Sequence, residues 1–168
     1  SNNEECTSVP ENSVAVFDVT TFRPVEFGRN WSWMEYRTYD MANQFLSDIQ
    51  SVLDGMDINM VHKRKRITKT VHKSYIRRIR QLSKELNYIK IYPNIDPLQV
   101  IQKTKACISM PFTSTAVIAK QEGKPSVYYD PTDIIQKDDR AAHGIPVLNG
   151  IGELQVWIES IKNNIDYE

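Results

Sequence analysis

Three consecutive hydroxyl side chains, Thr113, Ser114 and Thr115, lie where a strand-like segment gives way to a helical one. They belong to the stretch CISMPFTSTAVIAKQEGKPSVYYD, which has the pattern of a strand, a turn, a helix, a turn and a second strand. The first N–H groups of a helix have no partner within the helix, and the helix dipole places partial positive charge there. Such a helix end accepts phosphate readily, and the three hydroxyls would add donors to it. The alternative is that Thr113 is simply the N-cap of the helix.

A basic segment strengthens the case for a phosphate site. Nine Lys or Arg residues and no Asp or Glu occur from Lys63 to Arg80, although the formal net charge of the whole chain is zero. Lys63 and Lys65 leave the end of a predicted strand, where alternation along the strand places them on one side. The same alternation places Arg64 and Arg66 on the other side, and one of the two pairs would face a diphosphate. Arg23 follows the first predicted strand at the same edge of the sheet.

The other cations of the basic segment lie along a predicted helix, and three roles are open for them. They would solvate the outer face of the helix, contact a membrane surface, or bind nucleic acid. Nucleic acid recognition usually places stacking aromatic side chains among the cations, and Tyr75 is the one Phe, Tyr or Trp of the segment. Nucleic acid is therefore not expected as a partner.

A second polar cluster follows the fifth predicted strand, within YDPTDIIQKDDRAAHGIPVL at 129–148. Asp130 at the strand end would order this loop, pair with Arg140 or bind ribose hydroxyls. His143, which precedes Gly144, would serve as a phosphate donor, a general base or a hydrogen bonder that fixes the loop. Asp130 and His143 are the catalytic candidates of the chain, each with these alternatives.

Several common site chemistries are not expected. The histidines, His62, His72 and His143, have no spacing typical of metal ligands, so no metal site is expected. The sequence has no Walker loop, no G-x-G-x-x-G fingerprint and no nucleophile elbow. Asp18, after the first predicted strand, has the position of a response-regulator acceptor, but no acidic pair precedes it. A phospho-acceptor role is therefore not favoured.

Alternating strand-like and helical segments must position these groups. Strands are predicted over residues 13–19, 57–63, 88–92, 106–110, 125–130 and 145–149. Helices are predicted over residues 38–56, 70–86, 96–104, 113–123 and 153–163. This alternation predicts a three-layer α/β/α Rossmann-like sandwich around a parallel sheet of about six strands, with right-handed crossovers. In such a sheet, ligands bind beyond the carboxyl ends of the strands.

The composition is that of an ordinary globular domain, with 168 residues of which 40% are hydrophobic and 25% are charged. We expect a disordered polar segment over 1–12 and a single domain over 13–168. Cys107 lies in an apolar run and is expected to be a buried thiol rather than part of a disulfide scaffold. No apolar run approaches the ~20 residues that span a bilayer, and the polar start shows no signal peptide. The expected location is the cytoplasm, including the inner face of the membrane.

A family resemblance emerges from three stretches taken together. ISMPFTSTAVIAKQEGKPSVYYDPTDIIQKDDRAAHGIPVL at 108–148, preceded by VAVFDVTTFRP and MVHKRKR, resembles the C-terminal domain of bacterial surface-polysaccharide biosynthesis proteins of the capsule and lipopolysaccharide type. These proteins are similar to GT-B-fold glycosyltransferases, and the likeness covers roughly residues 14–160. The same pattern is similar to bacterial sialyltransferases, where a paired Ser/Thr holds the donor phosphate, and to teichoic-acid polymerases.

The resemblance implies that this domain binds a nucleotide-sugar donor, linked to UDP, GDP or CMP, as a substrate and without a tightly bound cofactor. It implies that Ser114 and Thr115 contact the donor phosphate. Lys63 and Lys65 would fit the diphosphate of a UDP- or GDP-sugar. Tyr92 stands where sialyltransferase-like enzymes often have the histidine of a His-Pro pair, and this departure disfavours a CMP donor.

A GT-B enzyme has two Rossmann-like domains, and this chain would supply one of them. The glycan or lipid-linked acceptor would then bind through a missing N-terminal domain, and the isolated domain is expected to be inactive. One alternative is a non-catalytic module that docks to a membrane or partner protein through the aromatic stretch at 20–37 and the basic helix. A second alternative is half of an epimerase-like enzyme that acts on nucleotide sugars.

Overall fold

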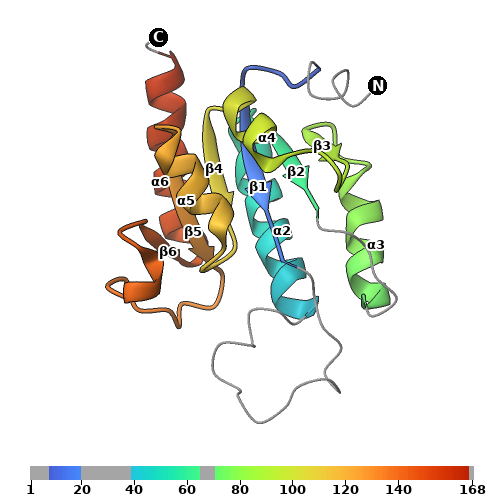
Figure 1. Ribbon diagram of the computed structural model, residues 1–168. Coiled ribbons are helices and arrows are strands. Elements are labelled where there is room, and N and C mark those ends of the chain that lie inside the picture. The colour runs from blue at the N-terminus through green and yellow to red at the C-terminus, as the bar shows by residue number, and fades with distance from the viewer. Residues whose placement is uncertain (1–7, 20–38, 65–70, 167–168) are drawn as a thin grey trace.

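The computed structural model describes residues 8–19, 39–64 and 71–166 of the chain. Six strands form a single sheet (Figure 1): β1 Ser13–Phe17, β2 Asn59–Lys63, β3 Tyr88–Ile91, β4 Ala106–Ser109, β5 Ser126–Asp130 and β6 Val147–Asn149. Within the described ranges, five α-helices accompany them: α2 Tyr39–Gly55, α3 Lys73–Leu82, α4 Pro97–Lys103, α5 Ser114–Gln121 and α6 Gly150–Asp166. A short 3-10 helix, η3, spans Arg140–Ala142.

The sheet has the strand order β3-β2-β1-β4-β5-β6, and every neighbouring pair is parallel. The chain moves outward from β1 to β3, crosses back to β4, and then moves outward in the other direction. The strand order therefore reverses between β1 and β4. In open α/β sheets, this switch point is where a crevice forms beyond the carboxyl ends of the strands.

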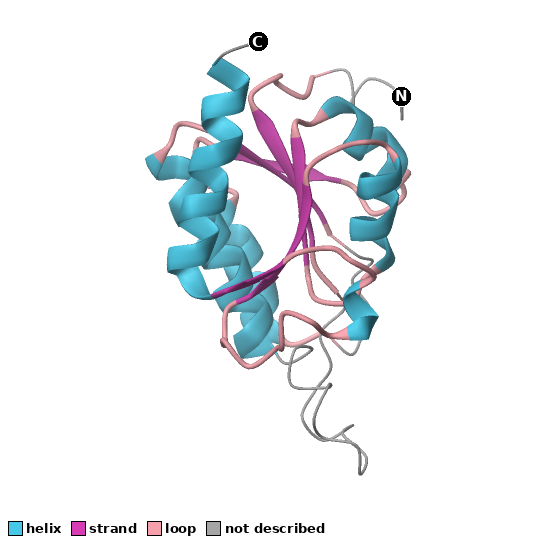
Figure 2. Ribbon diagram, turned by 90° about the vertical axis from the view of Figure 1, so that its left-hand side faces the viewer, coloured by secondary structure: helices cyan, strands magenta, loops and turns pink. Residues whose placement is uncertain are grey.

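Helices cover both faces of the sheet, as Figure 2 shows. The core on one face joins α2, α3 and α6 to the sheet, and the core on the other face joins α4 and α5 to it. Strands covered on both faces should be apolar on both sides of the pleat, and all five residues of β1, SVAVF, are buried. The predicted three-layer α/β/α Rossmann-like sandwich with about six parallel strands is confirmed.

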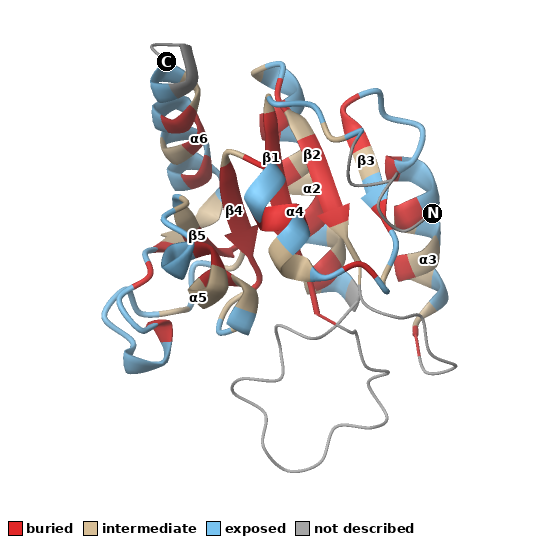
Figure 3. Cartoon of the chain, turned by 45° about the horizontal axis from the view of Figure 1, so that its top comes forward, coloured by how far each residue is buried: buried red, intermediate tan, exposed pale blue. Residues whose placement is uncertain are grey.

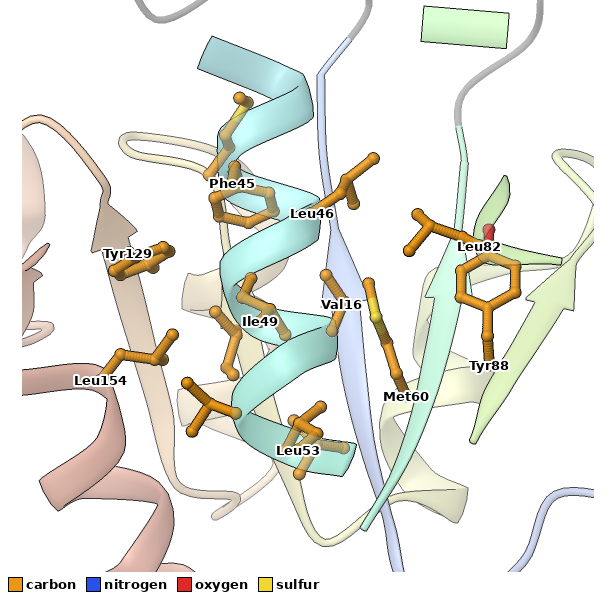
Figure 4. Close-up of a cluster of buried hydrophobic side chains, with 14 of the residues drawn as sticks. Val16, Phe45, Leu46, Ile49, Leu53, Met60, Leu82, Tyr88, Tyr129 and Leu154 are labelled. Carbon is orange, nitrogen blue, oxygen red and sulfur yellow. The ribbon is translucent and has the colours of Figure 1, made fainter. Parts of the chain in front are cut away.

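The larger core is centred on α2, which lies across β1 (Figure 4). Phe45, Leu46, Ile49 and Leu53 recur at the spacing of one helical face and are fully buried. Figure 3 shows buried residues concentrated in the sheet and on the inner sides of the helices. Cys107 belongs to the core on the α4–α5 face as a free buried thiol, as expected, and burial raises its pKa to about 12.

Most predicted elements occur within a few residues of their predicted bounds, and the largest differences are in two helices. α3 ends at Leu82 rather than near residue 86, because the chain turns through residues 83–87 before β3. α6 begins at Gly150, three residues before its predicted start, with Glu153 accepting a hydrogen bond from the Asn149 amide at 2.9 Å. The N-terminal signal of α4 is confirmed, with Asp96 as N-cap and Pro97 in the first turn.

The segment before β1 contacts the rest of the domain over its described part. Val9 packs against the core on the α4–α5 face, and Asn12 donates to the Asp57 carbonyl at 2.7 Å. Residues 1–7 of the segment that was expected to be disordered lie outside the described residues. No helix within the described ranges is long and apolar enough to cross a bilayer.

Candidate functional site

The hydroxyl turn, Pro111–Thr115, connects β4 to α5 next to the switch point of the sheet. Phe112 has a φ of 64°, a left-handed conformation that is uncommon for a bulky residue, and this sharp turn redirects the chain into the helix. Its ring packs edge-on against Tyr128 of β5, with the ring centroids 5.7 Å apart. The turn therefore has a fixed shape that is anchored to the neighbouring strand.

The hydroxyls of the turn form a short chain of contacts. Thr113 Oγ1 donates to the Met110 carbonyl at 2.9 Å and lies 3.2 Å from Thr115 Oγ1. Thr115 Oγ1 lies 3.0 Å from Ser109 Oγ, at the end of β4. The Ser114 side chain, in contrast, is exposed. Two of the three predicted hydroxyls thus hold the turn together, and the third is open to solvent.

The N-terminus of α5 lacks the side-chain cap that other helices of the domain possess. His72 accepts from Ser74 N at the start of α3, Asp96 accepts from Leu98 N at the start of α4, and Asp139 caps η3. Thr113 occupies the N-cap position of α5 but makes no side-chain cap hydrogen bond, because its hydroxyl is turned to Met110. The alternative that the Thr113 hydroxyl merely caps the helix is not what the structure shows. The first amides of α5 keep their capacity to bind an anion.

Lys63 shares an edge and a face of the sheet with the hydroxyl turn. Phe17 is the register partner of both Lys63 in β2 and Ser109 in β4, so the three residues lie at one level. Neighbouring strands are about 4.8 Å apart, which places the backbones of Lys63 and Ser109 about 10 Å from each other. Lys63 Nζ donates to the Pro93 carbonyl at 3.1 Å, on the β3 side. A ligand at the hydroxyl turn would therefore require this flexible side chain to swing across the end of β1.

The remaining predicted phosphate contacts are only partly described. Tyr92 follows β3, is 48% exposed and has Lys90 Nζ 6.0 Å from its ring centroid. It adjoins Pro93, the residue whose carbonyl Lys63 contacts. Arg23 and Lys65 lie outside the described residues, so their expected contacts stay predictions. The structure brings Lys63 and Tyr92 to one end of the carboxyl edge and the hydroxyl turn to the middle of it.

Asp130 at the end of β5 is occupied by its own loop. Its two carboxylate oxygens accept from the amides of Thr132, Ile134 and Ile135, each at 2.9 Å, and from Asn149 Nδ2 at 3.1 Å. Burial raises the pKa of the Asp130 carboxyl, but the hydrogen bonds from the Thr132 hydroxyl and from the three amides outweigh burial and hold the pKa below its usual range. Of the roles considered for Asp130, the structure therefore favours the ordering of the loop.

His143 belongs to the loop between β5 and β6. It ends η3 in a left-handed conformation with φ 51°, and its side chain is exposed. Its carbonyl accepts from Lys120 Nζ at 3.5 Å. Lys120 is six residues beyond Ser114, about 9 Å along the axis of α5. A mixed polar hollow of about 320 Å³ lies beside this loop and is lined in part by Arg140. Within the described residues, His143 makes no hydrogen bond with the hydroxyl turn or with Lys63, although the neighbouring Ala142 packs with Ala116 of α5 and Tyr128.

Comparison with known protein families identifies the chain. A family model described as polysaccharide biosynthesis PFTS motif protein matches residues 2–158. The chain belongs to this family of polysaccharide biosynthesis proteins. A search of curated proteins found no match. The role in polysaccharide biosynthesis that the sequence predicted is therefore confirmed at this level.

The letters that name the PFTS family occur once in this chain, at Pro111–Ser114 of the hydroxyl turn. Each position has a physical role here: Pro111 follows the end of β4, Phe112 takes the left-handed conformation, and Thr113 locks the turn to Met110. Ser114 then opens α5 with its hydroxyl exposed. The family's naming motif thus builds the open helix end at the carboxyl edge.

This PFTS protein also contains a buried polar network that sequence reasoning missed. His62 Nδ1 lies 2.7 Å from the Tyr88 hydroxyl, and His62 Nε2 lies 3.2 Å from Asp18 Oδ1. The Tyr75 hydroxyl donates to Asp18 Oδ2. Burial and the Asp18 charge raise the pKa of both tyrosines, while the nearby Arg64 charge lowers it. The network joins the ends of β1, β2 and α3 to β3.

One signal in the sequence could have indicated this network. His62 interrupts the otherwise apolar strand MVHK, and Asp18 follows a strand without a single polar residue after Ser13. Buried polar groups need partners, so two such groups on adjacent parallel strands point to each other. The network faces the α2–α3 side of the sheet, whereas the hydroxyl turn faces the α4–α5 side. The network therefore stabilises the carboxyl edge from the α2–α3 side of the sheet and does not line the candidate site.

Proposed function

We propose that this domain binds the nucleotide-sugar donor of a glycosyltransferase that acts in polysaccharide biosynthesis. The observation that carries the proposal is the uncapped N-terminus of α5, built by the PFTS motif at the switch point of the sheet. A phosphate at this position would accept hydrogen bonds from the first amides of α5 and from the Ser114 hydroxyl. The helix dipole would stabilise its negative charge.

Lys63 would provide the second element of the donor site. Its ammonium lies on the same face and edge as the turn and contacts a carbonyl in the described structure. An incoming diphosphate would attract the ammonium more strongly than a neutral carbonyl does, because opposite full charges attract each other in addition to the hydrogen bond. A diphosphate donor of the UDP or GDP type therefore suits the site better than a monophosphate donor.

The chemistry assigned to the domain is electrostatic. Transfer of a sugar leaves negative charge on the departing nucleotide phosphate, and fixed donors directed at that charge lower the barrier. The hydroxyl chain from Ser109 to Thr113 would keep the donors of the turn in place before the ligand arrives. Asp130 and His143 receive no catalytic role, because the Asp130 carboxylate is occupied by its own loop and, among the described contacts, His143 has none with the hydroxyl turn.

The described residues form one Rossmann-like unit, whereas a GT-B enzyme closes its active site between two such units. We propose that a second Rossmann-like domain, on this chain or on a partner, provides the acceptor site. The domain alone would then bind the donor nucleotide and fail to transfer sugar.

Calorimetric titration with CMP, UDP, GDP and CDP tests the proposal. The informative variant is Ser114→Ala/Thr115→Val, which removes two hydroxyls from the turn while Val retains the shape of Thr. The matched control is Ser83→Ala/Ser160→Ala, which removes two hydroxyls that donate to the Ile79 and Trp157 carbonyls away from the turn. Loss of a hydrogen bond to a charged group costs about 1.5–3 kcal/mol, so each lost phosphate contact should weaken binding roughly 10- to 100-fold.

Selective binding of one nucleotide that is lost in the turn variant and kept in the control would support the donor site and name the base. Selective binding that survives in the turn variant would place the phosphate elsewhere. A folded domain that binds none of the four nucleotides would contradict the proposal.

A further inference from the structure

Two neighbouring helices of this neutral chain carry charges of opposite sign. α3 carries Lys73, Arg77, Arg78 and Arg80 and has no acidic residue. α2, which packs beside it, carries three Asp and no Lys or Arg. Since the formal net charge of the protein is zero, this separation gives the domain one basic flank at α3, next to the edge strand β3 (Figure 1).

Three of these cations form a single line, which we call the α3 stripe: Lys73, Arg77 and Arg80. Their i, i+4, i+7 spacing places them on one side of the helix, and all three are exposed. The opposite side is formed by Tyr75, Ile79 and Leu82, which are buried against the core. The stripe extends about 10 Å along the helix axis, and exposed Lys84 continues it in the following turn.

Two features of the α3 stripe oppose the stability of its helix, although Arg80 lies in the last turn, where the helix dipole favours a cation. Lys73 is in the first turn, where the helix dipole favours negative charge. Lys73 and Arg77 are four residues apart and Arg77 and Arg80 are three apart, so like charges are adjacent on the helix surface. Among the described residues, no carboxylate lies within ion-pair distance of these side chains. An ordinary solvated face mixes both signs, so this stripe indicates an anionic partner.

We propose that the α3 stripe docks the domain on an anionic lipid surface. The stripe is a straight row on a convex helix at the flank of the molecule, a shape that meets a plane of headgroups with all its cations at once. Leu86, in the turn between α3 and β3, is fully exposed two residues beyond Lys84. Glu85, between Lys84 and Leu86, is also exposed, but Lys73, Arg77, Arg80 and Lys84 outnumber it. An exposed Leu beside this row of cations gains by entering the lipid interface.

The same features disfavour nucleic acid and fix the orientation. Binding of single-stranded nucleic acid uses aromatic side chains as stacking platforms, and the only aromatic residue of α3, Tyr75, is buried. The exposed acids of α2, Asp40 and Asp54, would be repelled by an anionic surface. The domain therefore sits with α3 and the β3 edge toward the membrane and α2 turned away.

Vesicle co-sedimentation of the full chain tests this surface. The probe is a set of vesicles that mix phosphatidylglycerol with phosphatidylcholine, and vesicles of phosphatidylcholine alone are the neutral comparison. Binding of the chain to polyuridylate RNA is measured separately. The test variant is Lys73→Gln/Arg77→Gln/Arg80→Gln, and glutamine keeps good helix propensity. The matched control, Lys103→Gln/Lys105→Gln/Lys124→Gln, removes the same charge from the α4–α5 face.

We expect binding to the anionic vesicles only, weakened by added salt. Each cation near an anionic surface contributes about fivefold, so the stripe variant should lose binding on the order of 100-fold, with the control close to the parent. Leu86→Ser should weaken vesicle binding several-fold. Equal losses in the stripe variant and the control, binding to phosphatidylcholine alone, or tighter binding to the RNA than to the vesicles would each overturn the proposal. Nucleotide binding, measured separately, should not change in the stripe variant.

Discussion

The turns after β4 and β5, at the carboxyl edge of the sheet, differ in how their backbone amides find hydrogen-bond acceptors. Each follows a buried strand, and each contains backbone amides that need a hydrogen-bond acceptor. After β5, the Asp130 carboxylate accepts from the amides of Thr132, Ile134 and Ile135. After β4, the hydroxyl turn uses its Thr hydroxyls to fix its own shape and leaves the first amides of α5 without a side-chain cap.

The contrast separates a structural turn from a binding turn. A carboxylate that fills a turn leaves no room for an anion and repels it, whereas hydroxyls can both hold a turn and donate to a ligand. Of the two turns, only the one after β4 contains the PFTS motif. Changes to Asp130 should therefore affect stability, and changes to Ser114 should affect ligand binding.

The largest expected effect is that of Asp130→Ala. The substitution would leave three amides in a partly buried loop without their acceptor, at a cost of about 1–3 kcal/mol per unsatisfied group before relaxation. We expect a loss of about 3 kcal/mol in the free energy of unfolding, measured by urea denaturation. The control Asp138→Ala, at an exposed position of the same loop, should stay within about 0.5 kcal/mol of the parent. A loss below about 1 kcal/mol for Asp130→Ala would contradict the structural role.

The same carboxylate predicts how stability depends on pH. Its pKa is lower in the folded protein than in the unfolded chain, where an Asp has a pKa of about 3.9. Its contribution is therefore fully present above about pH 4 and is lost as the pH falls through the folded-state pKa. Denaturation of the parent and of Asp130→Asn at a series of pH values should show a smaller acid loss in the variant. Parallel curves would show that Asp130 is not the responsible group.

Single substitutions in the hydroxyl turn should affect nucleotide affinity and the free energy of unfolding separately. Ser114→Ala removes an exposed hydroxyl, so the free energy of unfolding should change by less than about 0.5 kcal/mol while nucleotide affinity falls at least about 10-fold. Thr115→Val breaks the contacts to Ser109 and Thr113 and should cost about 1 kcal/mol of stability. Calorimetry and urea denaturation of both variants check this. Unchanged nucleotide affinity in Ser114→Ala would argue against a phosphate contact at that hydroxyl.

The smallest effect concerns the link between the two turns. Tyr128, two residues before Asp130, donates its hydroxyl to the Thr113 carbonyl at 3.2 Å. Tyr128→Phe removes this hydrogen bond and keeps the ring contact with Phe112, so it should cost about 0.5–1.5 kcal/mol of stability. Urea denaturation measures the cost. A larger loss than that of Asp130→Ala would reverse the order proposed for the two turns.

Sequence patterns predicted the elements of this fold because periodicity reports local geometry directly. Strand-like apolar segments alternate with helical segments, and this alternation predicted the parallel sheet. Asp96 followed by Pro97 predicted the start of α4. The strand order was not predicted, since it depends on which strands pair rather than on any one strand. The early start of α6 at Gly150 was also missed, because the interaction between Glu153 and the Asn149 amide that caps it involves residues on either side of the predicted boundary.

The site was predicted only where one short segment builds it. The hydroxyl turn is local, so its position at the start of a helix followed from the sequence alone. Loop ordering by Asp130, one of the roles predicted for it, is also mostly local, because Thr132, Ile134 and Ile135 lie within five residues of it. The partners of Asp18, in contrast, come from a strand and a helix more than forty residues away. A linear pattern names such polar residues but does not show which groups fill their hydrogen bonds.

The most direct test of the account compares backbone amide signals of the two turns by NMR during titration with UDP and GDP. We predict that the amide signals of Ser114, Thr115 and Ala116 shift with a common binding curve. The amides of Thr132, Ile134 and Ile135 should stay in place, because Asp130 already accepts from them. Shifts confined to the Asp130 turn, or a bound nucleotide that leaves the start of α5 unperturbed, would contradict the assignment of the hydroxyl turn as the phosphate site.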